Sequence, residues 1–180
     1  MNDKRQYIIY EKSENNKCRY ALGVKGNNPL IFLGINPSTA TPDDYDQTMK
    51  KAKGFALKNN FDSWIMLNIY PQRATNPDNL DEKLNVKFHK DNIKIIKKYI
   101  KNNATVVAAW GNPINKRDYL LKCLQGIVKE LKSKQMKWSR IGKLTKSGNP
   151  WHISRLGYDE KIVRFDIDDY LSKKQGYNHG

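Results

Sequence analysis

Three side chains suited to hydrogen-bond chemistry, Asn36, Asn68 and His152, lie in short polar segments of this 180-residue chain. Asn36 belongs to the sequence Gly-Ile-Asn-Pro-Ser, Asn68 interrupts an apolar run, and His152 lies in a loop that also holds Gly148 and Pro150. A carboxamide both donates and accepts hydrogen bonds, and a neutral imidazole can donate one. Brought together, these groups could read a polar ligand and orient a water molecule.

Each of these residues also has a purely structural explanation. Asn-Pro commonly starts a turn, which would account for Asn36. The amide of a buried Asn68 could be satisfied by a neighbouring loop. His152 could be an ordinary surface histidine, and Trp110-Gly111 could be core packing followed by a turn into a helix. The case for a site therefore depends on where these segments lie in the fold.

The apolar runs at residues 30–35, 64–69 and 104–110 are short and nearly continuous, which is typical of strands buried on both faces of a parallel sheet. A fourth strand is expected at 137–141 and an N-terminal hairpin from 7–10 and 19–24. Helices are expected at 47–60, 86–101, 111–132 and 166–173, from apolar residues at helical spacing.

This pattern predicts the α/β class, as a three-layer α/β/α sandwich with a mostly parallel four-stranded central sheet plus an N-terminal β hairpin, in one domain over residues 1–180. Ligands of such sheets bind beyond the carboxyl ends of the strands. The segments that hold Asn36, Asn68, Trp110-Gly111 and His152 each follow a predicted strand. We therefore expect them to meet at one edge of the sheet.

The charge of the chain is strongly positive, with 33 Lys and Arg against 18 Asp and Glu and a formal net charge of +15. Residues 116–155 alone hold 11 basic and two acidic residues, so the excess leads up to the loop that holds His152. Such an excess favours a polyanionic partner, but it is also compatible with a merely soluble surface.

Several classes of protein are not supported by the sequence. Cys18 and Cys123 are too far apart for a Cys-x-x-Cys pair and are expected to be buried thiols. The histidines lack the spacing of metal ligands, so we expect neither a metal nor a cofactor. No run of eighteen apolar residues and no apolar leader is present, which predicts a cytoplasmic protein without a membrane partner.

Four motifs, taken in order, resemble the uracil/thymine-DNA glycosylase superfamily. Residues 34–38 are similar to the Gly-Ile-Asn-Pro-Gly motif of its mismatch-specific branch. Residues 67–68 are similar to the segment with the uracil-reading Asn of the uracil-specific branch, and 107–111 to that branch's strand ending in Trp-Gly. Residues 152–156, His-Ile-Ser-Arg-Leu, resemble its His-Pro-Ser-Pro-Leu loop. The resemblance spans residues 31–156 and implies a uracil-DNA-glycosylase-like fold.

The chain resembles more closely a group of short bacterial and phage domains of undefined function. Their pattern runs Asn-Pro-Ser-Thr-Ala, Asp-x-Thr, Arg-Ala-Thr-x-Pro-x-x-Leu, Trp-Gly and a late Pro-x-His. The matching positions in this sequence are Asn36–Ala40, Asp46 with Thr48, Arg73–Leu80, Trp110-Gly111, and Pro150 with His152.

The glycosylase resemblance implies roles for the motif residues. Asn36 would position the attacking water, and Asp46 would assist it unless it only caps the following helix, as we expect of Asp43 and Asp44. His152 would donate a hydrogen bond to the departing base. Residues implied to bind substrate are Ser38, Asn68, Arg73 and Thr48, although Arg73 could instead pair with a carboxylate.

The loop after His152 is implied to fill the gap left by a flipped base, with Leu156 as its apolar wedge. The residues expected to bind DNA are Arg117, Lys143, Lys146, Arg155 and Leu156. Ser38 departs from the uracil-specific enzymes, which have a Tyr at this place that blocks substituents on C5 of the pyrimidine. A serine would admit thymine or larger C5-modified bases, such as the glucosylated hydroxymethylcytosine of phage DNA.

The resemblance thus implies a monofunctional, monomeric DNA glycosylase that acts on a modified pyrimidine or a uracil or thymine mismatch, in DNA repair or in defence against phage. Two alternatives remain. The domain could be a non-catalytic module that binds modified DNA. It could also be a nucleotide or small-molecule hydrolase on the same scaffold, for which the basic charge would be incidental.

Overall fold

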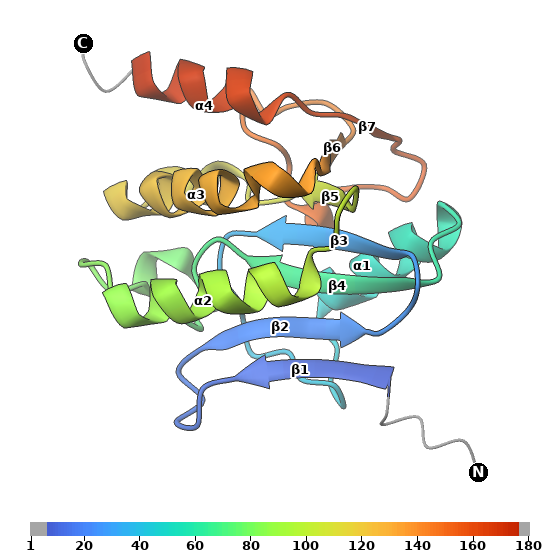
Figure 1. Ribbon diagram of the computed structural model, residues 1–180, viewed down its shortest axis with the longest axis horizontal. Coiled ribbons are helices and arrows are strands. Elements are labelled where there is room, and N and C mark those ends of the chain that lie inside the picture. Colours follow the sequence, from blue (N-terminus) through green and yellow to red (C-terminus); the bar gives the residue numbers. More distant parts are fainter. Residues whose placement is uncertain (1–6, 177–180) are drawn as a thin grey trace.

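The computed structural model describes residues 7–176, in which seven strands form one central sheet (Figure 1). The strands are β1 (Ile8–Lys12), β2 (Arg19–Val24), β3 (Pro29–Gly34), β4 (Ser63–Asn68), β5 (Thr105–Ala108), β6 (Lys137–Ile141) and β7 (Ile162–Arg164). The helices are α1 (Gln47–Lys58), α2 (Val86–Tyr99), α3 (Asp118–Leu131) and α4 (Ile167–Gly176). The predicted α/β class is confirmed.

The sheet is mixed and runs in the order β1-β2-β4-β3-β5-β6-β7. Strand β3 is parallel to both β4 and β5, and β5 is parallel to β6. The predicted four-stranded sheet is therefore too small. The N-terminal hairpin is β1 and β2, and β2 also pairs antiparallel with β4, while β7 adds an antiparallel edge beside β6. Strand β2 is buried along nearly all its length, which allows it an interior place in the sheet.

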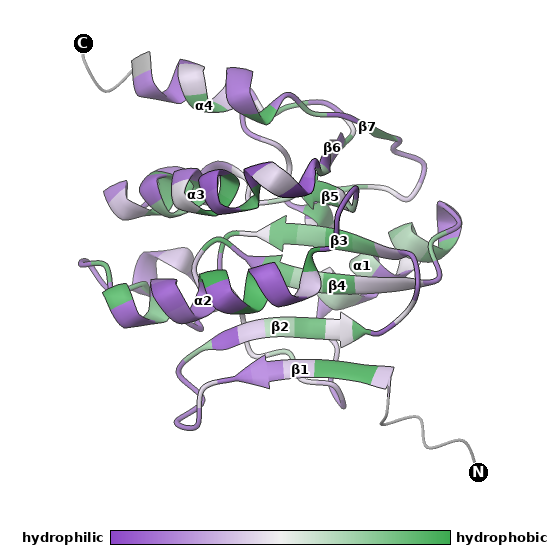
Figure 2. Ribbon diagram, viewed as in Figure 1, coloured by the Kyte–Doolittle hydropathy of each residue, from purple (hydrophilic) through white to green (hydrophobic). Residues whose placement is uncertain are grey.

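The sheet is covered on both faces, because alternate residues of the parallel strands enter two different cores. Ile31, Leu33 and Val106 pack with residues of α2, α3 and α4. Leu30 and Phe32 pack on the other face with residues of α1. Figure 2 shows α2 and α3 with alternating purple and green segments, as expected of helices with one buried side.

Helix α1 follows the predicted pattern, with Met49, Ala52, Phe55 and Ala56 buried. Its N-cap is Asp46, whose side chain accepts a hydrogen bond from the Met49 N–H. Capping by Asp43 or Asp44 is therefore wrong for this helix. Both of those residues are exposed in the turn before it.

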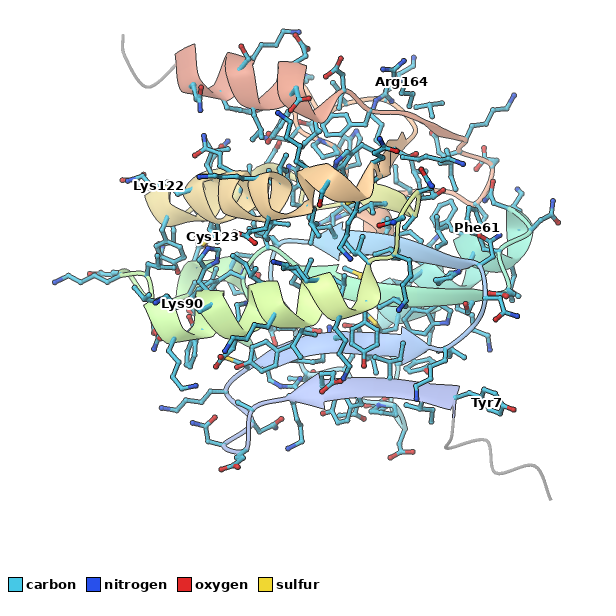
Figure 3. All side chains as sticks on the ribbon, viewed as in Figure 1. Tyr7, Phe61, Lys90, Lys122, Cys123 and Arg164 are labelled. Carbon is cyan, nitrogen blue, oxygen red and sulfur yellow. The ribbon has the colours of Figure 1, made fainter. Side chains whose placement is uncertain are left out.

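Helix α3 begins later than the sequence predicts. Gly111 has a φ of 64°, which a side chain would strain, and Asn112–Asn115 form a separate 3₁₀ turn (η3) before the helix starts at Asp118. Pro113 fits the first turn of either helix type, so the pattern alone does not separate them. Beyond this start the helix is amphipathic. Lys122 is exposed and its neighbour Cys123 is buried (Figure 3).

Both cysteines are buried, as predicted, and burial raises the pKa of Cys18 to about 11 and that of Cys123 to about 12. Neither thiol is therefore ionised near neutral pH. None of the helices in the described part of the chain has the length and apolar character needed to cross a membrane.

Candidate functional site

A pocket of about 410 Å³ lies where the parallel strands end. Asn36 follows β3, Asn68 ends β4, Gly111 follows β5, and His152 lies in the loop after β6. All four line the same pocket. The expected convergence of the four segments is confirmed, and the volume lies in the range of pockets that hold small ligands.

Asn68 is 1% exposed, yet its amide nitrogen Nδ2 has no hydrogen-bond partner among the described residues. The backbone carbonyl of Asn68 is held separately, by Asn92 of α2 at 2.8 Å. Gly34 leaves the space for the Asn68 side chain, since a Cβ there would lie 3.0 Å from Asn68 Oδ1 and 2.5 Å from Met66 Cε. A buried donor without a partner lowers the free energy of unfolding by about 1–3 kcal/mol. Asn68 is therefore better explained by a bound ligand than by a role in stabilising the fold.

Asn36 is oriented by the loop that follows β4. Its Nδ2 donates to Ala74 O at 2.7 Å and to Pro37 O at 3.2 Å. The amide nitrogen is thereby committed to backbone carbonyls. The oxygen Oδ1 remains as a hydrogen-bond acceptor at the pocket, which is the atom that a water donor requires.

Asp46 has two structural bonds and still lines the pocket. Its Oδ1 accepts from Met49 N at 2.9 Å, and its Oδ2 accepts from Ser38 Oγ at 2.5 Å. A carboxylate has about four acceptor sites, so two remain for other donors. Thr48 lines the pocket beside Asp46. Asp46 therefore caps α1 and also places a negative charge in the pocket.

His152 is held by the residue two positions ahead. Its Nδ1 lies 2.7 Å from Ser154 Oγ and 3.4 Å from the Ser154 backbone N–H, which can only donate. This assigns the proton of the neutral ring to Nε2. Burial lowers the pKa of His152 below its ordinary 6.5, Asp46 opposes that shift, and Arg155 adds to it. The imidazole is therefore a neutral hydrogen-bond donor near pH 7.

A chain of buried hydrogen bonds fixes the loop before His152. Asn149 is fully buried, and its Nδ2 donates to Asn112 Oδ1 at 2.9 Å while its Oδ1 accepts from Tyr170 OH at 2.8 Å. Trp110 Nε1 donates to the same Tyr170 hydroxyl at 3.1 Å. Gly111 lies against this loop, and its φ of 64° disfavours any residue with a side chain there. Helix α4 thus supports the site from outside the pocket.

Arg73 does not line the pocket. Its Nη1 donates to Ser38 O at 2.7 Å and its Nη2 to Tyr10 OH at 2.8 Å. No acidic side chain pairs with it among the described residues. The structure therefore places Arg73 behind the Asn-Pro-Ser segment, as a support for Ser38, and apart from the other predicted substrate residues.

Arg19 lines the pocket but is absent from the residues predicted from sequence. It begins β2, and β2 runs antiparallel to β4, so the start of β2 lies beside the end of β4. The pattern of the N-terminal hairpin gives no sign of that pairing. The one local signal is a charged residue at the start of an otherwise apolar strand.

Of the basic residues expected to bind DNA, three are exposed and one is bonded to backbone carbonyls. Arg155 is exposed and lines the pocket. Lys143 and Lys146 are exposed in the preceding loop and form no ion pair with another described residue. Arg117 is occupied, because its guanidinium donates to backbone carbonyls that include Asp78 O and Leu80 O, both at 2.7 Å.

The basic stretch also runs away from the pocket. Helix α3 starts near the end of β5 and leads to the start of β6, so Lys132 and Lys134 lie toward the opposite edge of the sheet. There Lys134 Nζ donates to Ile100 O at 2.7 Å. Only the two ends of the 116–155 stretch therefore lie on the pocket side.

Leu156 is 8% exposed and packs in the core on the α1 face. This is at odds with its predicted role as a wedge, because insertion into DNA would remove it from that core. The segment between β6 and β7 exposes the large apolar side chains of Leu144, Trp151 and Tyr158, and of these Trp151, which is 40% exposed, lines the pocket. The other three tryptophans, Trp64, Trp110 and Trp138, are buried.

Within residues 7–176 no group of three or more His, Cys, Asp and Glu side chains is arranged to hold a metal ion. The chemistry available at the pocket is that of amides, one carboxylate, one neutral imidazole and guanidinium groups. These groups suit recognition of a polar ring and activation of water.

The fold and site define a mixed α/β domain with a polar pocket at the carboxyl ends of its parallel strands. The chain belongs to the family described as "Protein of unknown function (DUF1643)", which matches residues 19–152. That segment contains every pocket motif up to His152. No curated protein and no solved structure matches the chain. The glycosylase resemblance therefore rests on the four motifs alone.

Proposed function

We propose that the protein is a monofunctional DNA glycosylase with a uracil-DNA-glycosylase-like fold. It hydrolyses the N-glycosidic bond of a flipped-out pyrimidine and leaves an abasic site. The observation that carries the proposal is the buried Asn68 amide, whose Nδ2 has no partner within residues 7–176, in a pocket that also contains Asn36 and His152. A pyrimidine edge presents the acceptor that this amide needs.

The proposed reaction uses the side chains of Asn36, His152 and Asp46. Asn36 Oδ1 accepts a hydrogen bond from water and directs the water oxygen toward C1′ of the sugar. As the C1′–N1 bond breaks, its electron pair passes to the base, and the Nε2–H of His152 stabilises the anion that forms. Asp46 stabilises the positive charge that develops on the sugar and receives the water proton.

Substrate selection is assigned to Ser38. Its small side chain points its hydroxyl to Asp46 and leaves room where a larger residue would stand against C5 of the pyrimidine. The substrate is therefore a C5-substituted pyrimidine, of which glucosylated hydroxymethylcytosine and mismatched thymine are examples. The role of such an enzyme is in DNA repair or in defence against phage.

Trp151 takes the place proposed from sequence for Leu156. Its exposed indole at the rim of the pocket can stack on a base next to the flipped nucleotide, and Arg155 provides a cation beside it. Lys143 and Lys146 supply further positive charge to the phosphates.

The test is base release from oligonucleotides that carry uracil, mismatched thymine, hydroxymethylcytosine or glucosyl-hydroxymethylcytosine, followed by alkaline cleavage of abasic sites. The decisive variant is Asp46→Asn, because Asn can still cap α1 but carries no charge. We expect it to reduce base release by about 10²-fold or more while Tm changes little. Asn36→Ala should act in the same direction.

The matched control is Asn85→Ala, which removes the N-cap of α2 away from the pocket. It should lower Tm without changing base release per folded molecule. Absence of strand cleavage on every substrate would contradict the glycosylase assignment.

A second candidate is a non-catalytic module that binds modified DNA. It is favoured by Asp46 being already engaged by Ser38 and Met49. In that case DNA binding persists in wild type and in Asp46→Asn, and no base is released. A small-molecule hydrolase would instead cleave free nucleosides as well as it cleaves DNA. Ser38, His152 and Asp46 are not arranged as a catalytic triad for nucleophilic attack. Ser38 bonds directly to Asp46, and His152 Nδ1 bonds to Ser154.

A further inference from the structure

Arg19 is a buried cation in the wall of the pocket. It is 1% exposed, its Nη1 donates to Ala40 O at 2.9 Å, and its Nε has no partner in the part of the chain that the structure describes. No carboxylate lies within 4 Å of it among the described residues. Burial of an unpaired charge opposes folding by several kcal/mol, so such a residue needs an explanation.

The bond to Ala40 determines which edge of the guanidinium is free. Nη1 is used, so the edge formed by Nε and Nη2 is left, and no partner of either atom is found within residues 7–176. This edge binds an oxyanion side-on through two parallel hydrogen bonds. The geometry of the free edge therefore matches a carboxylate or phosphate group better than a single carbonyl.

The charges around Arg19 also favour an anion. The guanidinium of Arg73 and the carboxylate of Asp46 both act on it, and the carboxylate is already bonded to Ser38 and Met49. Burial, the largest cause, and Arg73 lower the pKa of Arg19 to about 10, and Asp46 opposes them. Arg19 thus stays charged at pH 7, in a region with two arginines and one acid.

Arg19 is bonded to the segment that holds Ser38, because its Nη1 donates to Ala40 O, two residues after Ser38. Arg19 and Ser38 both line the pocket together with Asp46 and Asn68. A pyrimidine whose polar edge reaches Asn68 would direct its C5 substituent toward the wall that Ser38 and Arg19 share.

We propose that Arg19 forms a subsite for an oxyanion carried on the C5 substituent of the pyrimidine, as a carboxylate or as a phosphate ester. This inference rests on the proposed function for the identity of the ring. It narrows the substrate from any C5-substituted pyrimidine to one whose substituent is negatively charged.

The test measures binding of free bases to the full chain by calorimetry, so that it does not depend on catalysis. The probes are uracil, 5-hydroxymethyluracil, 5-carboxyuracil and the phosphate ester of 5-hydroxymethyluracil. We expect one of the two anionic bases to bind at least about 10-fold more tightly than 5-hydroxymethyluracil, which corresponds to one charge-assisted hydrogen-bond pair. The two anionic probes distinguish a carboxylate from a phosphate.

Arg19→Gln should remove this preference. Arg19→Lys should keep part of it, since Lys retains the charge but lacks the two parallel N–H donors of the guanidinium. The matched control is Arg117→Gln. Arg117 also donates to backbone carbonyls, Asp78 O and Leu80 O, but it does not line the pocket, so the ratio of affinities should persist. Thermal melting of each variant verifies that it is folded.

Equal affinity for charged and uncharged bases, or no binding of any base, would overturn the subsite. So would a preference that survives in Arg19→Gln or is lost equally in Arg117→Gln. Base release from DNA is then measured separately with oligonucleotides that carry the same bases. Selective binding of a charged base without release from DNA would support the subsite and count against the glycosylase. Release of uracil with no preference for a charged base would do the opposite.

Discussion

The polar side chains at the two ends of strand β4 differ in whether their hydrogen bonds are satisfied within the protein. At its start, Asp62 is exposed, yet its carboxylate accepts from Asn27 N at 2.8 Å, Asn28 N at 3.0 Å and Ser63 Oγ at 2.7 Å. At its end, Asn68 is buried and its Nδ2 has no partner between residues 7 and 176. Burial makes the second arrangement the costlier one.

The difference separates what the fold requires from what a ligand requires. Asp62 joins β4 to the loop before β3, so its bonds are complete without any other molecule. At the other end, Asn68 Nδ2 and Arg19 Nε have no partner within residues 7–176, and both residues line the pocket, as the proposed ligand would require. Substitutions at the first end should therefore affect stability, and those at the second should affect activity.

The largest effect is expected from Asn68→Ala. Loss of the amide should lower kcat/KM for base release by about 10²–10³-fold, because a buried donor to the departing base is removed. Tm should stay the same or rise. The matched control is Asn92→Ala, which removes a buried amide that is bonded to Asn68 O and should destabilise by about 1–3 kcal/mol. Equal losses of Tm in both variants would show that Asn68 serves the fold.

The next effect concerns the rim of the pocket. Trp151→Ala should weaken DNA binding by roughly 5- to 150-fold, the range for loss of one aromatic stack on a base. The measurement is fluorescence anisotropy of a labelled duplex. Leu57→Ala is the control, because Leu57 is 62% exposed and lies near the start of β4. Unchanged affinity in Trp151→Ala would remove the indole from the DNA contact.

A smaller effect is expected at the start of β4. Asp62→Ala leaves two backbone N–H groups and a hydroxyl without their acceptor, and should lower Tm by about 2–4 °C. Base release per folded molecule should not change. If Asp62→Ala lost activity without a loss of Tm, the start of β4 would not have the purely structural role that we assign to it.

The smallest effect is the response to pH. The pKa of His152 is lowered from 6.5 by burial, so the unfolded chain binds a proton at a higher pH than the folded chain does. The contribution of the neutral His152 side chain to the free energy of unfolding is therefore fully present above pH 6.5, and it decreases as the pH falls below 6.5. The pKa of Asp62 is lowered from 3.8, mainly by the Ser63 hydroxyl, so its contribution is lost only below that value.

Urea midpoints between pH 8 and pH 5 test this order. His152→Gln should show a weaker loss on acidification than wild type. His89→Gln is needed for comparison, because burial lowers the pKa of His89 as well. An identical pH response of wild type and His152→Gln would assign the effect to His89 alone.

Much of the pocket follows from local sequence. The apolar runs that become β3, β4 and β5 end within two residues of the predicted points, so Asn36, Asn68 and Gly111 come to one edge. This works because a strand buried on both faces is apolar at nearly every position, so the end of the apolar run lies close to the end of the strand.

Features that depend on distant pairing are not visible in the sequence. Arg19 reaches the pocket only because β2 inserts beside β4, a pairing between residues more than forty positions apart. The contrast between buried Leu156 and exposed Trp151 depends on how the loop after β6 lies against α1, which no periodicity encodes. The direction of α3 likewise carries much of the basic charge to the opposite edge.

The hydrogen bond from Trp110 to Tyr170 has a consequence for where the working unit ends. The family match stops at residue 152, whereas Tyr170 lies in α4 and completes the buried chain that holds Asn149. A fragment cut at the family boundary would end at His152, and would lose both Ser154, which orients His152, and the hydrogen bonds of Tyr170. The shortest portion able to act alone therefore extends at least through the first turn of α4.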